Sequence, residues 1–113
     1  MNDNFQSIRV FQTSADYADF AARWHENHGD KNTATQFYRR KDRLITEVDH
    51  LWNQLFDDWS TEAKALIVQA KTRNRDLEKQ IKSIENTVDN SQNALQALAL
   101  LDQVLDLAKK VFP

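Results

Sequence analysis

Residues 37–59 read FYRRKDRLITEVDHLWNQLFDDW, and the spacing of their apolar side chains decides the predicted fold. Successive apolar residues stand mostly three, four or seven positions apart, which is the spacing of one face of an α-helix. At 100° per residue they cover an arc of about 100–140°, wider than the seam of a two-stranded coiled coil. The pattern therefore predicts a long helix over residues 33–58 that contacts more than one neighbour. The face comprises Phe37, Leu44, Ile45, Val48, Leu51, Trp52, Leu55, Phe56 and Trp59.

The scarcity of glycine and proline extends this helical interpretation to most of the chain. The 113 residues include one Gly, one Pro and no Cys, and residues 31–112 contain none of the three. A domain of this size ordinarily holds about 7% Gly and 5% Pro, because tight turns need both. Sandwiches, barrels and α/β folds are therefore poor candidates. Glycine-rich phosphate loops, disulfides and cysteine zinc sites are absent from the sequence.

The second half of the chain predicts another long helix, over residues 61–112. The acidic and hydroxyl-rich stretch from Asp57 to Glu62 precedes it and is suited to cap a helix start. Folding back at this point buries more apolar surface within one chain than a straight rod would. A second corner near residues 89–91, where polar residues interrupt the apolar spacing, is left open.

The N-terminal part of the chain predicts two shorter elements. Ile8 and Val10 alternate with polar residues, which favours an extended arm over residues 1–12. Hydroxyl residues and an acid then open a short helix over residues 14–28, and Gly29 ends it.

Together these segments predict a single all-α domain over residues 1–113. Its expected architecture is an antiparallel helical hairpin or a three- to four-helix bundle, with long helices and a short N-terminal extended arm. Charge alternates in blocks along the chain: residues 46–62 are acidic, and residues 63–82 hold six basic and two acidic side chains. Such alternation is typical of solvated helix faces and helps to select the register of paired helices.

Apolar surface in excess of what one hairpin covers predicts protein–protein contact as the function. The wide stripe before Trp59 and the broad face over residues 94–112 exceed what the narrow seam over residues 77–88 can cover. We therefore predict a non-enzymatic helical interaction module, acting as an adaptor, a chaperone or a component of a secreted complex. Its expected partners are a second copy of the chain, as a homodimer, and an unidentified protein. The predicted interface residues are Leu44, Val48, Leu51, Trp52, Leu55, Phe56, Trp59, Leu77, Ile81, Ile84, Val88, Leu98, Leu101 and Leu105.

Two histidine-containing motifs offer a metal-binding alternative. Glu47-Val-Asp-His50 matches the Glu-x-x-His motif of di-iron helical bundles, so that a homodimer would supply two copies to an oxidase site. On the predicted helix, however, both side chains point away from the apolar stripe. His25 and His28 form a second pair but supply only two ligands. No metal, cofactor or catalytic residue is therefore assigned.

The basic run Arg39-Arg40-Lys41-Asp42-Arg43 offers a nucleic-acid alternative, since such side chains bind phosphates. Its side chains fan around the predicted helix, and an acidic block follows them. The net charge of −2 and the pI near 5.9 give no overall reason to bind nucleic acid or anionic membranes. Nucleic acid and membranes are therefore not expected among the partners.

The sequence shows no recognisable targeting segment. The stretch from Met1 to Gln6 has neither the basic residues nor the long apolar run of a Sec-type signal peptide. No stretch approaches the roughly 18 apolar residues of a membrane span. The expected location is the cytoplasm, or outside the cell after export without a cleaved signal peptide.

The segment Leu55-Phe-Asp-Asp-Trp59-Ser-Thr61-Glu-Ala63 resembles the Trp-x-Gly corner of small helical-hairpin substrates of type VII secretion, the early-secreted-antigen type. Thr61 stands where that family has Gly. The resemblance covers residues 33–98 and implies two antiparallel helices on either side of the Trp59 corner. It also implies that two such hairpins pack as a four-helix dimer and are exported without a signal peptide.

Overall fold

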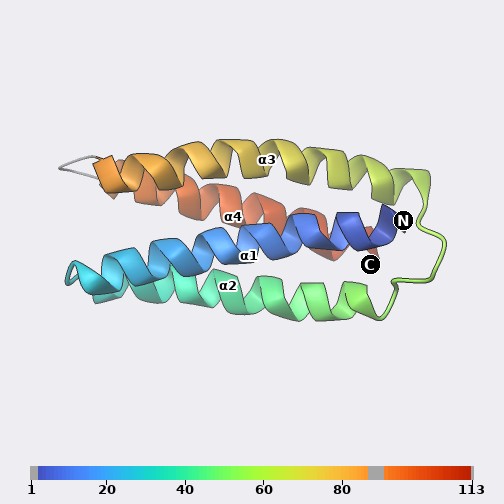
Figure 1. Cartoon of the computed structure of the whole chain (residues 1–113), viewed down its shortest axis with the longest axis horizontal. Helices are drawn as coiled ribbons and strands as arrows, with labels where there is room; N and C mark the ends of the chain where they lie inside the picture. Colours follow the sequence, from blue (N-terminus) through green and yellow to red (C-terminus); the bar gives the residue numbers. More distant parts are fainter. Residues whose placement is uncertain (1–2, 87–90, 113) are drawn as a thin grey trace.

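A computed structural model describes residues 3–86 and 91–112, which form four α-helices (Figure 1). The helices are α1 (Asp3–Asn27), α2 (Lys31–Trp52), α3 (Thr61–Asn86) and α4 (Ser91–Val111). No strand occurs in these two ranges, so the predicted all-α class is confirmed, in its four-helix form. The molecule measures 46 × 24 × 21 Å, as expected for helices that run along one common axis.

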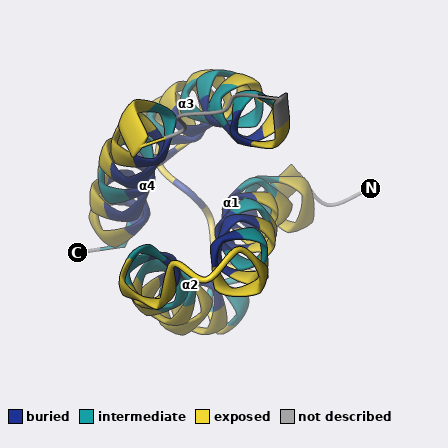
Figure 2. Cartoon of the chain, turned by 90° about the vertical axis from the view of Figure 1, so that its left-hand side faces the viewer, coloured by how far each residue is buried: buried dark blue, intermediate teal, exposed yellow. Residues whose placement is uncertain are grey.

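The helices form two antiparallel hairpins that lie side by side (Figures 1 and 2). α1 packs most extensively on α2, and α3 on α4. Between the hairpins, α1 lies beside α3 and α2 lies beside α4, each pair running in the same direction. α2 and α3 are consecutive in sequence, yet within the described ranges their backbones make no contact, because they occupy opposite corners of the bundle.

The chain does turn back near residues 57–61, but the expected hairpin of the helices on either side does not form. Instead, the connection of residues 53–60 crosses the end of the bundle from α2 to α3 (Figure 2). Packed helix axes lie about 8–10 Å apart, so diagonally opposite axes are about 11–14 Å apart. Eight residues reach that far even with residues 53–56 in a turn. The length of this connection therefore permits the diagonal arrangement.

α2 ends six residues before the predicted boundary, and two side chains bond to the backbone that follows it. The Trp59 indole Nε1 donates to the carbonyl oxygen of Gln54 at 2.9 Å. From the start of α1, the Asn4 amide donates to the carbonyl oxygens of Leu55 and Asp57, at 2.9 and 2.8 Å. Because side chains satisfy these carbonyls, the connection is held in a fixed non-helical path.

The predicted extended arm over residues 1–12 is wrong, because α1 takes in most of this segment. Ile8 and Phe11 are fully buried on one helical face, whereas Val10, which alternates with Ile8, is only half-buried. Packing of this face on α2 and α3 supplies the stabilisation that a short isolated helix lacks. The helix predicted over residues 14–28 is therefore the second half of a longer one.

The turn between α1 and α2 contains the predicted stop at Gly29, but the helix after it starts two residues earlier than predicted. Gly29 ends α1 with a φ of 82°, a conformation that glycine adopts without steric strain. α2 then begins at Lys31 rather than at Thr33. Asp30 is the cap, since its carboxylate accepts a hydrogen bond from the Thr33 backbone N–H at 3.1 Å.

The helix predicted over residues 61–112 consists of two helices, α3 and α4. Its start is capped by a hydroxyl as expected, because Ser60 Oγ accepts a hydrogen bond from the Ala63 backbone N–H at 3.0 Å. The corner left open at residues 89–91 falls mainly on residues 87–90, which lie outside the described residues.

The core lies along the centre of the bundle, where the buried faces of all four helices meet (Figure 2). α4 contributes mainly leucine and valine to it. α1 contributes small side chains, which let the backbone of α2 approach closely. These buried alanines are Ala15, Ala18, Ala21 and Ala22.

Candidate functional site

The predicted interface residues lie mainly in the core of a single chain. Trp52 and Leu55 are half-buried, Phe56 is exposed, and Val88 lies outside the described residues. The apolar surface from which a homodimer was expected is therefore largely covered within one chain, and homodimerisation stays a prediction. The ten buried residues are Leu44, Val48, Leu51, Trp59, Leu77, Ile81, Ile84, Leu98, Leu101 and Leu105.

α1 begins, α4 ends and the connection crosses at one end of the bundle (Figure 1). Aromatic and acidic side chains are exposed there. Phe56 has 89% of its surface exposed, and the exposed Asp57 and Asp58 follow it. Phe5 is 37% exposed and meets the half-buried Trp52 edge-on, with ring centroids 5.4 Å apart. We call these five residues the end patch.

The backbone beneath the end patch is anchored on both sides of Phe56. Asn4 holds the carbonyl groups of the residues before and after it. Trp59 is buried and meets Phe112 edge-on, with ring centroids 5.3 Å apart. The exposed phenyl ring is therefore presented on a fixed support.

A groove of about 470 Å³ lies between α1 and α3, near the end patch. Arg9, Lys71 and Arg75 line it, and its lining within the described part of the chain includes no Asp or Glu; we call it the cationic groove. All three side chains are exposed, and the ion pairs found within residues 3–86 and 91–112 include none of them. Such a groove is suited to an acidic partner. Its other lining residues are Gln6, Val10, Thr13 and Asn74.

The cationic groove is joined to the end patch and has a fixed floor. The Arg9 guanidinium carbon lies 5.9 Å from the ring centre of Phe5, so the patch and the groove form one continuous surface. Below them, Asn74 Nδ2 donates to the Val10 carbonyl oxygen at 2.8 Å, and Asn74 Oδ1 accepts from the buried Ser14 hydroxyl. These bonds fix α1 against α3.

The opposite end of the bundle contains a buried histidine. His25 is 2% exposed, stacks on Phe37 with ring centroids 5.6 Å apart, and meets Trp24 edge-on. Its Nδ1 lies 3.7 Å from Asp30 Oδ2, and its Nε2 finds no hydrogen-bond partner in the described part of the chain. Burial lowers the pKa of His25; Asp30 opposes this effect and His28 adds to it. The imidazole is therefore neutral at neutral pH.

A cavity of about 190 Å³ adjoins this histidine. Residues from the α1–α2 turn and from the start of α2 form its polar wall, and α4 forms its apolar wall. The lining residues other than His25 are Asp30, Thr33, Gln36, Ser91, Ala94, Leu95 and Leu98.

The described residues do not bring the histidine-containing motifs of the metal alternative together into a cluster. Glu47 is half-buried and His50 is exposed, as their positions on the helix predict. At the other motif, His28 stacks on Trp24, with ring centroids 3.7 Å apart. Within the described ranges, no three His, Asp or Glu side chains are placed to hold one metal ion.

The basic run joins helices to one another. Arg40 donates from Nε and Nη2 to the two carboxylate oxygens of Asp102, at 3.0 and 3.1 Å, and so links α2 to α4. Lys41 Nζ lies 2.9 Å from Asp19 Oδ1 and links α2 to α1. The hydrogen bond from Lys41 lowers the pKa of Asp19. The two other arginines of the run are exposed, and nucleic-acid binding through them stays a prediction.

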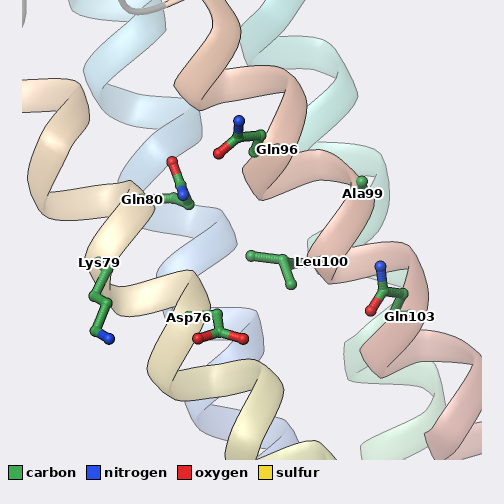
Figure 3. A pocket seen from close by; sticks show the side chains of 7 residues that line it. All are labelled: Asp76, Lys79, Gln80, Gln96, Ala99, Leu100 and Gln103. Carbon is green, nitrogen blue, oxygen red and sulfur yellow. The ribbon is translucent and has the colours of Figure 1, made fainter.

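A further groove, of about 370 Å³, lies between α3 and α4 (Figure 3). Leu100 points from α4 toward α3, and amide and charged side chains surround it. Acidic and basic groups both occur there, in contrast to the cationic groove. The lining residues are Asp76, Lys79, Gln80, Gln96, Ala99, Leu100 and Gln103.

The cationic groove and the buried histidine were not predicted from the sequence. The basic excess of residues 63–82 is a signal for one wall of the groove, but Arg9 on the other wall lay in a segment predicted as extended. In the sequence, His25 stands out only as one of two possible metal ligands. Its spacing of seven, four and three from Ala18, Ala21 and Ala22 is the signal that would have placed it on the buried face.

The chain matches no family model, no curated protein and no solved structure. The resemblance to type VII secretion substrates therefore stays a prediction. None of the described helices is both long and apolar enough to cross a membrane.

Proposed function

We propose that the chain is a non-enzymatic helical interaction module that pairs with a second copy of itself. In this pairing, the end patch of each protomer meets the cationic groove of the other. One observation carries the proposal: Phe56 is 89% exposed beside Asp57 and Asp58, at the same end of the bundle as an acid-free cationic groove.

The exposure of Phe56 supplies the hydrophobic part of the contact. Burying apolar surface contributes about 25 cal/mol per Å². Exposed aromatic side chains next to polar ones mark contact surfaces, and aromatic residues are common among those that dominate binding. Because Asn4 and Trp59 already fix the backbone on either side, little conformational entropy is lost when the ring docks.

The charges supply orientation. A twofold dimer uses the same surface on both copies, so that surface has to be complementary to itself. Here Asp57 and Asp58 form an acidic half, and Arg9, Lys71 and Arg75 form a basic half. A rotation of 180° sets each half against its opposite, twice in one dimer. The net charge of −2 adds little repulsion between copies.

The position of the groove limits the overlap of the two copies to their ends. Arg9, Lys71 and Arg75 lie about 9, 15 and 21 Å along α1 and α3 from the helix starts, and both helices start at the crossing end. The copies therefore overlap within the half of the 46 Å bundle nearest that end and leave the other half accessible. Each dimer would then present two distant Gly29 ends to further partners.

Sedimentation velocity over a range of micromolar concentrations tests this function. We expect the unaltered chain to form a concentration-dependent dimer that weakens as salt rises, because its charge pairs are at the surface. Phe56→Ser should be monomeric over the same range. The double variant Lys71→Glu/Arg75→Glu should also be monomeric, since it sets acid against acid.

The matched control is Arg39→Glu/Arg43→Glu, which makes the same change of charge at two exposed arginines of α2. We expect it to dimerise as the unaltered chain does. An unaltered chain that stays monomeric at all concentrations, or a control as impaired as the groove variant, would contradict the proposed pairing.

A further inference from the structure

A second groove between α1 and α3 combines exposed apolar surface with acidic side chains. It has a volume of about 240 Å³ and lies farther from the crossing end than the cationic groove does. The buried Ile81 and Phe20, which is 43% exposed, supply most of its apolar surface. We call it the acidic groove. The other residues that line it are Asp16, Tyr17, Glu78, Lys82 and Glu85.

The carboxylates of the acidic groove differ in whether their charge is already balanced. Glu78 accepts a hydrogen bond from the half-buried Tyr17, and its Oε1 lies 2.9 Å from Lys82 Nζ. Asp16 and Glu85 are exposed, and the ion pairs found within residues 3–86 and 91–112 include neither of them. Three acids against one lysine therefore leave the lining with an excess of two negative charges, beside an exposed aromatic ring.

The walls of the acidic groove favour a helical occupant. Both walls are turns of α-helices, in which backbone N–H and C=O groups bond to one another. An extended segment would find few backbone groups there to pair with, whereas a helix satisfies its own. Amphipathic helices dock into such grooves through apolar side chains that stand three and four residues apart.

The register of α1 and α3 sets the spacing that a docked helix needs. Asn74 bonds to Val10 and to Ser14, so it lies level with the turn between them. By the same offset, Asp16 and Glu85 lie about 10 Å apart along the groove, a distance that seven residues of a helix span. Basic side chains seven positions apart would therefore reach both acids. Apolar side chains three and four positions after the first basic one would lie between them, over the exposed ring.

We propose that the acidic groove binds an amphipathic helix of a partner protein, in which two apolar residues stand between basic residues seven positions apart. The apolar side chains cover Phe20, and the basic ones pair with Asp16 and Glu85. Most of the groove lies in the half of the bundle that the proposed dimer leaves accessible, because Phe20 is about 25 Å along α1 from the helix start. Docking therefore does not depend on pairing.

Two other occupants fit the acidic groove less well. A second copy offers its cationic groove, whose charge is suitable, but the described lining of that groove holds one apolar residue, the half-buried Val10. It therefore brings no large apolar side chain to cover Phe20. The surface of an anionic membrane or of a nucleic acid would be repelled by the excess of negative charge.

Fluorescence anisotropy with a synthetic peptide tests the proposal on the full chain. The probe is a fluorescein-labelled, alanine-based helix of about 18 residues that carries leucine pairs between lysines seven positions apart. We expect saturable binding that weakens as salt rises, because charge pairs at the surface are screened. A peptide of the same composition in scrambled order should bind about tenfold more weakly or worse, since its leucines no longer share one face.

Variants of the chain separate the apolar contact from the charges. Phe20→Ser should weaken binding about tenfold, because aromatic anchors dominate such contacts. Asp16→Lys/Glu85→Lys should lose the peptide, and should instead bind one in which glutamates replace the lysines, a gain that a misfolded chain would not show. The matched control Asp42→Lys/Asp49→Lys makes the same change of charge at two exposed acids of α2. It should bind the original peptide as the unaltered chain does.

The results also separate this docking from the proposed dimer. Phe56→Ser, which should prevent pairing, is expected to bind the peptide as the unaltered chain does. Equal binding of the ordered and scrambled peptides, a control as impaired as the groove variant, or an unaltered chain that binds neither peptide would each overturn the proposal. A loss of self-association in Phe20→Ser would overturn it as well, because a second copy would then be the occupant.

Discussion

The two ends of this bundle depart from the usual distribution of side chains in opposite ways. At the crossing end, the large apolar Phe56 is left in water. At the Gly29 end, the polar His25 is placed in the core with an unsatisfied ring nitrogen. Exposed large apolar groups and buried polar groups are the informative exceptions in a folded protein. Elsewhere most large apolar side chains lie in the core; Phe20, Ile45, Val68 and Leu95 are exposed, but each less than Phe56.

The comparison teaches that an irregular feature has to be interpreted from its neighbours. Phe56 is surrounded by fixed backbone and acids, which suits contact with another macromolecule. His25 is surrounded by aromatic rings and one carboxylate and is closed off from solvent, which makes the stability of the fold depend on its protonation. Substitutions at the two ends should therefore change different properties.

The largest effect on stability is expected at the crossing end, one turn beyond the exposed ring. Trp59→Ala should lower the free energy of unfolding by about 3–5 kcal/mol, because it removes the contact with Phe112 and the bond to Gln54. Phe56→Ala, three residues away, should change it by no more than about 0.5 kcal/mol. Urea unfolding at a concentration below that of pairing measures both. Equal losses of stability would contradict the assignment of Trp59 to supporting the fold and of Phe56 to contacting a partner.

The next largest effect concerns the Gly29 end and depends on pH. Since burial lowers the pKa of His25, the unfolded chain takes up the proton first as the pH falls below about 6.5. Stability from this residue is complete above that pH and is lost progressively below it, until the folded form is also protonated. Asp30 is the acid facing the ring and moderates the effect, and the described lining of α4 carries no charge there.

His25→Phe should remove this pH dependence and raise the free energy of unfolding by about 1–2 kcal/mol, because no polar atom is then left unpaired. Urea unfolding between pH 4.5 and 6.5 measures it. The pKa values of Asp19 and Asp30 are lowered from an ordinary value of 3.8, so their contributions are lost only at more acidic pH. His50→Gln, at an exposed position, is the control; a pH slope unchanged in His25→Phe would contradict this account.

The smallest effect is expected away from both ends. Arg40→Met removes the bidentate pair with Asp102, which is partly exposed to solvent, and should cost about 1 kcal/mol or less. The same variant should dimerise and respond to pH as the unaltered chain does. Sedimentation and urea unfolding check both expectations, and a clear loss of pairing here would place the contact surface on α2 and α4 instead.

The periodicity of the sequence predicts which residues of a helix are buried better than it predicts which other helices they contact. Leu44, Leu51 and Leu77 lie in the core because a spacing of three and four is a property of one helix. The stop at Gly29 was predicted for a similarly local reason. The extended arm was wrong because alternation over a few residues is a weak signal, and packing on other helices decides such a segment.

The neighbours of each helix depend on distances that the local pattern does not contain. Arg9 and Arg75 share a groove only because α1 lies beside α3, and that arrangement follows from a connection long enough to cross the bundle. His25 is buried because Phe37 and α4 cover it. Both candidate sites therefore emerge from tertiary structure, whereas the fold class is evident from composition and spacing.

An exchange of charges between two variants tests the central claim most directly. Asp57→Lys/Asp58→Lys and Lys71→Glu/Arg75→Glu should each sediment as monomers, because each sets like charges against one another in its own dimer. An equimolar mixture of the two restores opposite charges at both contacts. We therefore predict that the mixture sediments as a dimer at concentrations at which each variant alone is monomeric. A mixture that remains monomeric while the unaltered chain dimerises would contradict the pairing of end patch with cationic groove.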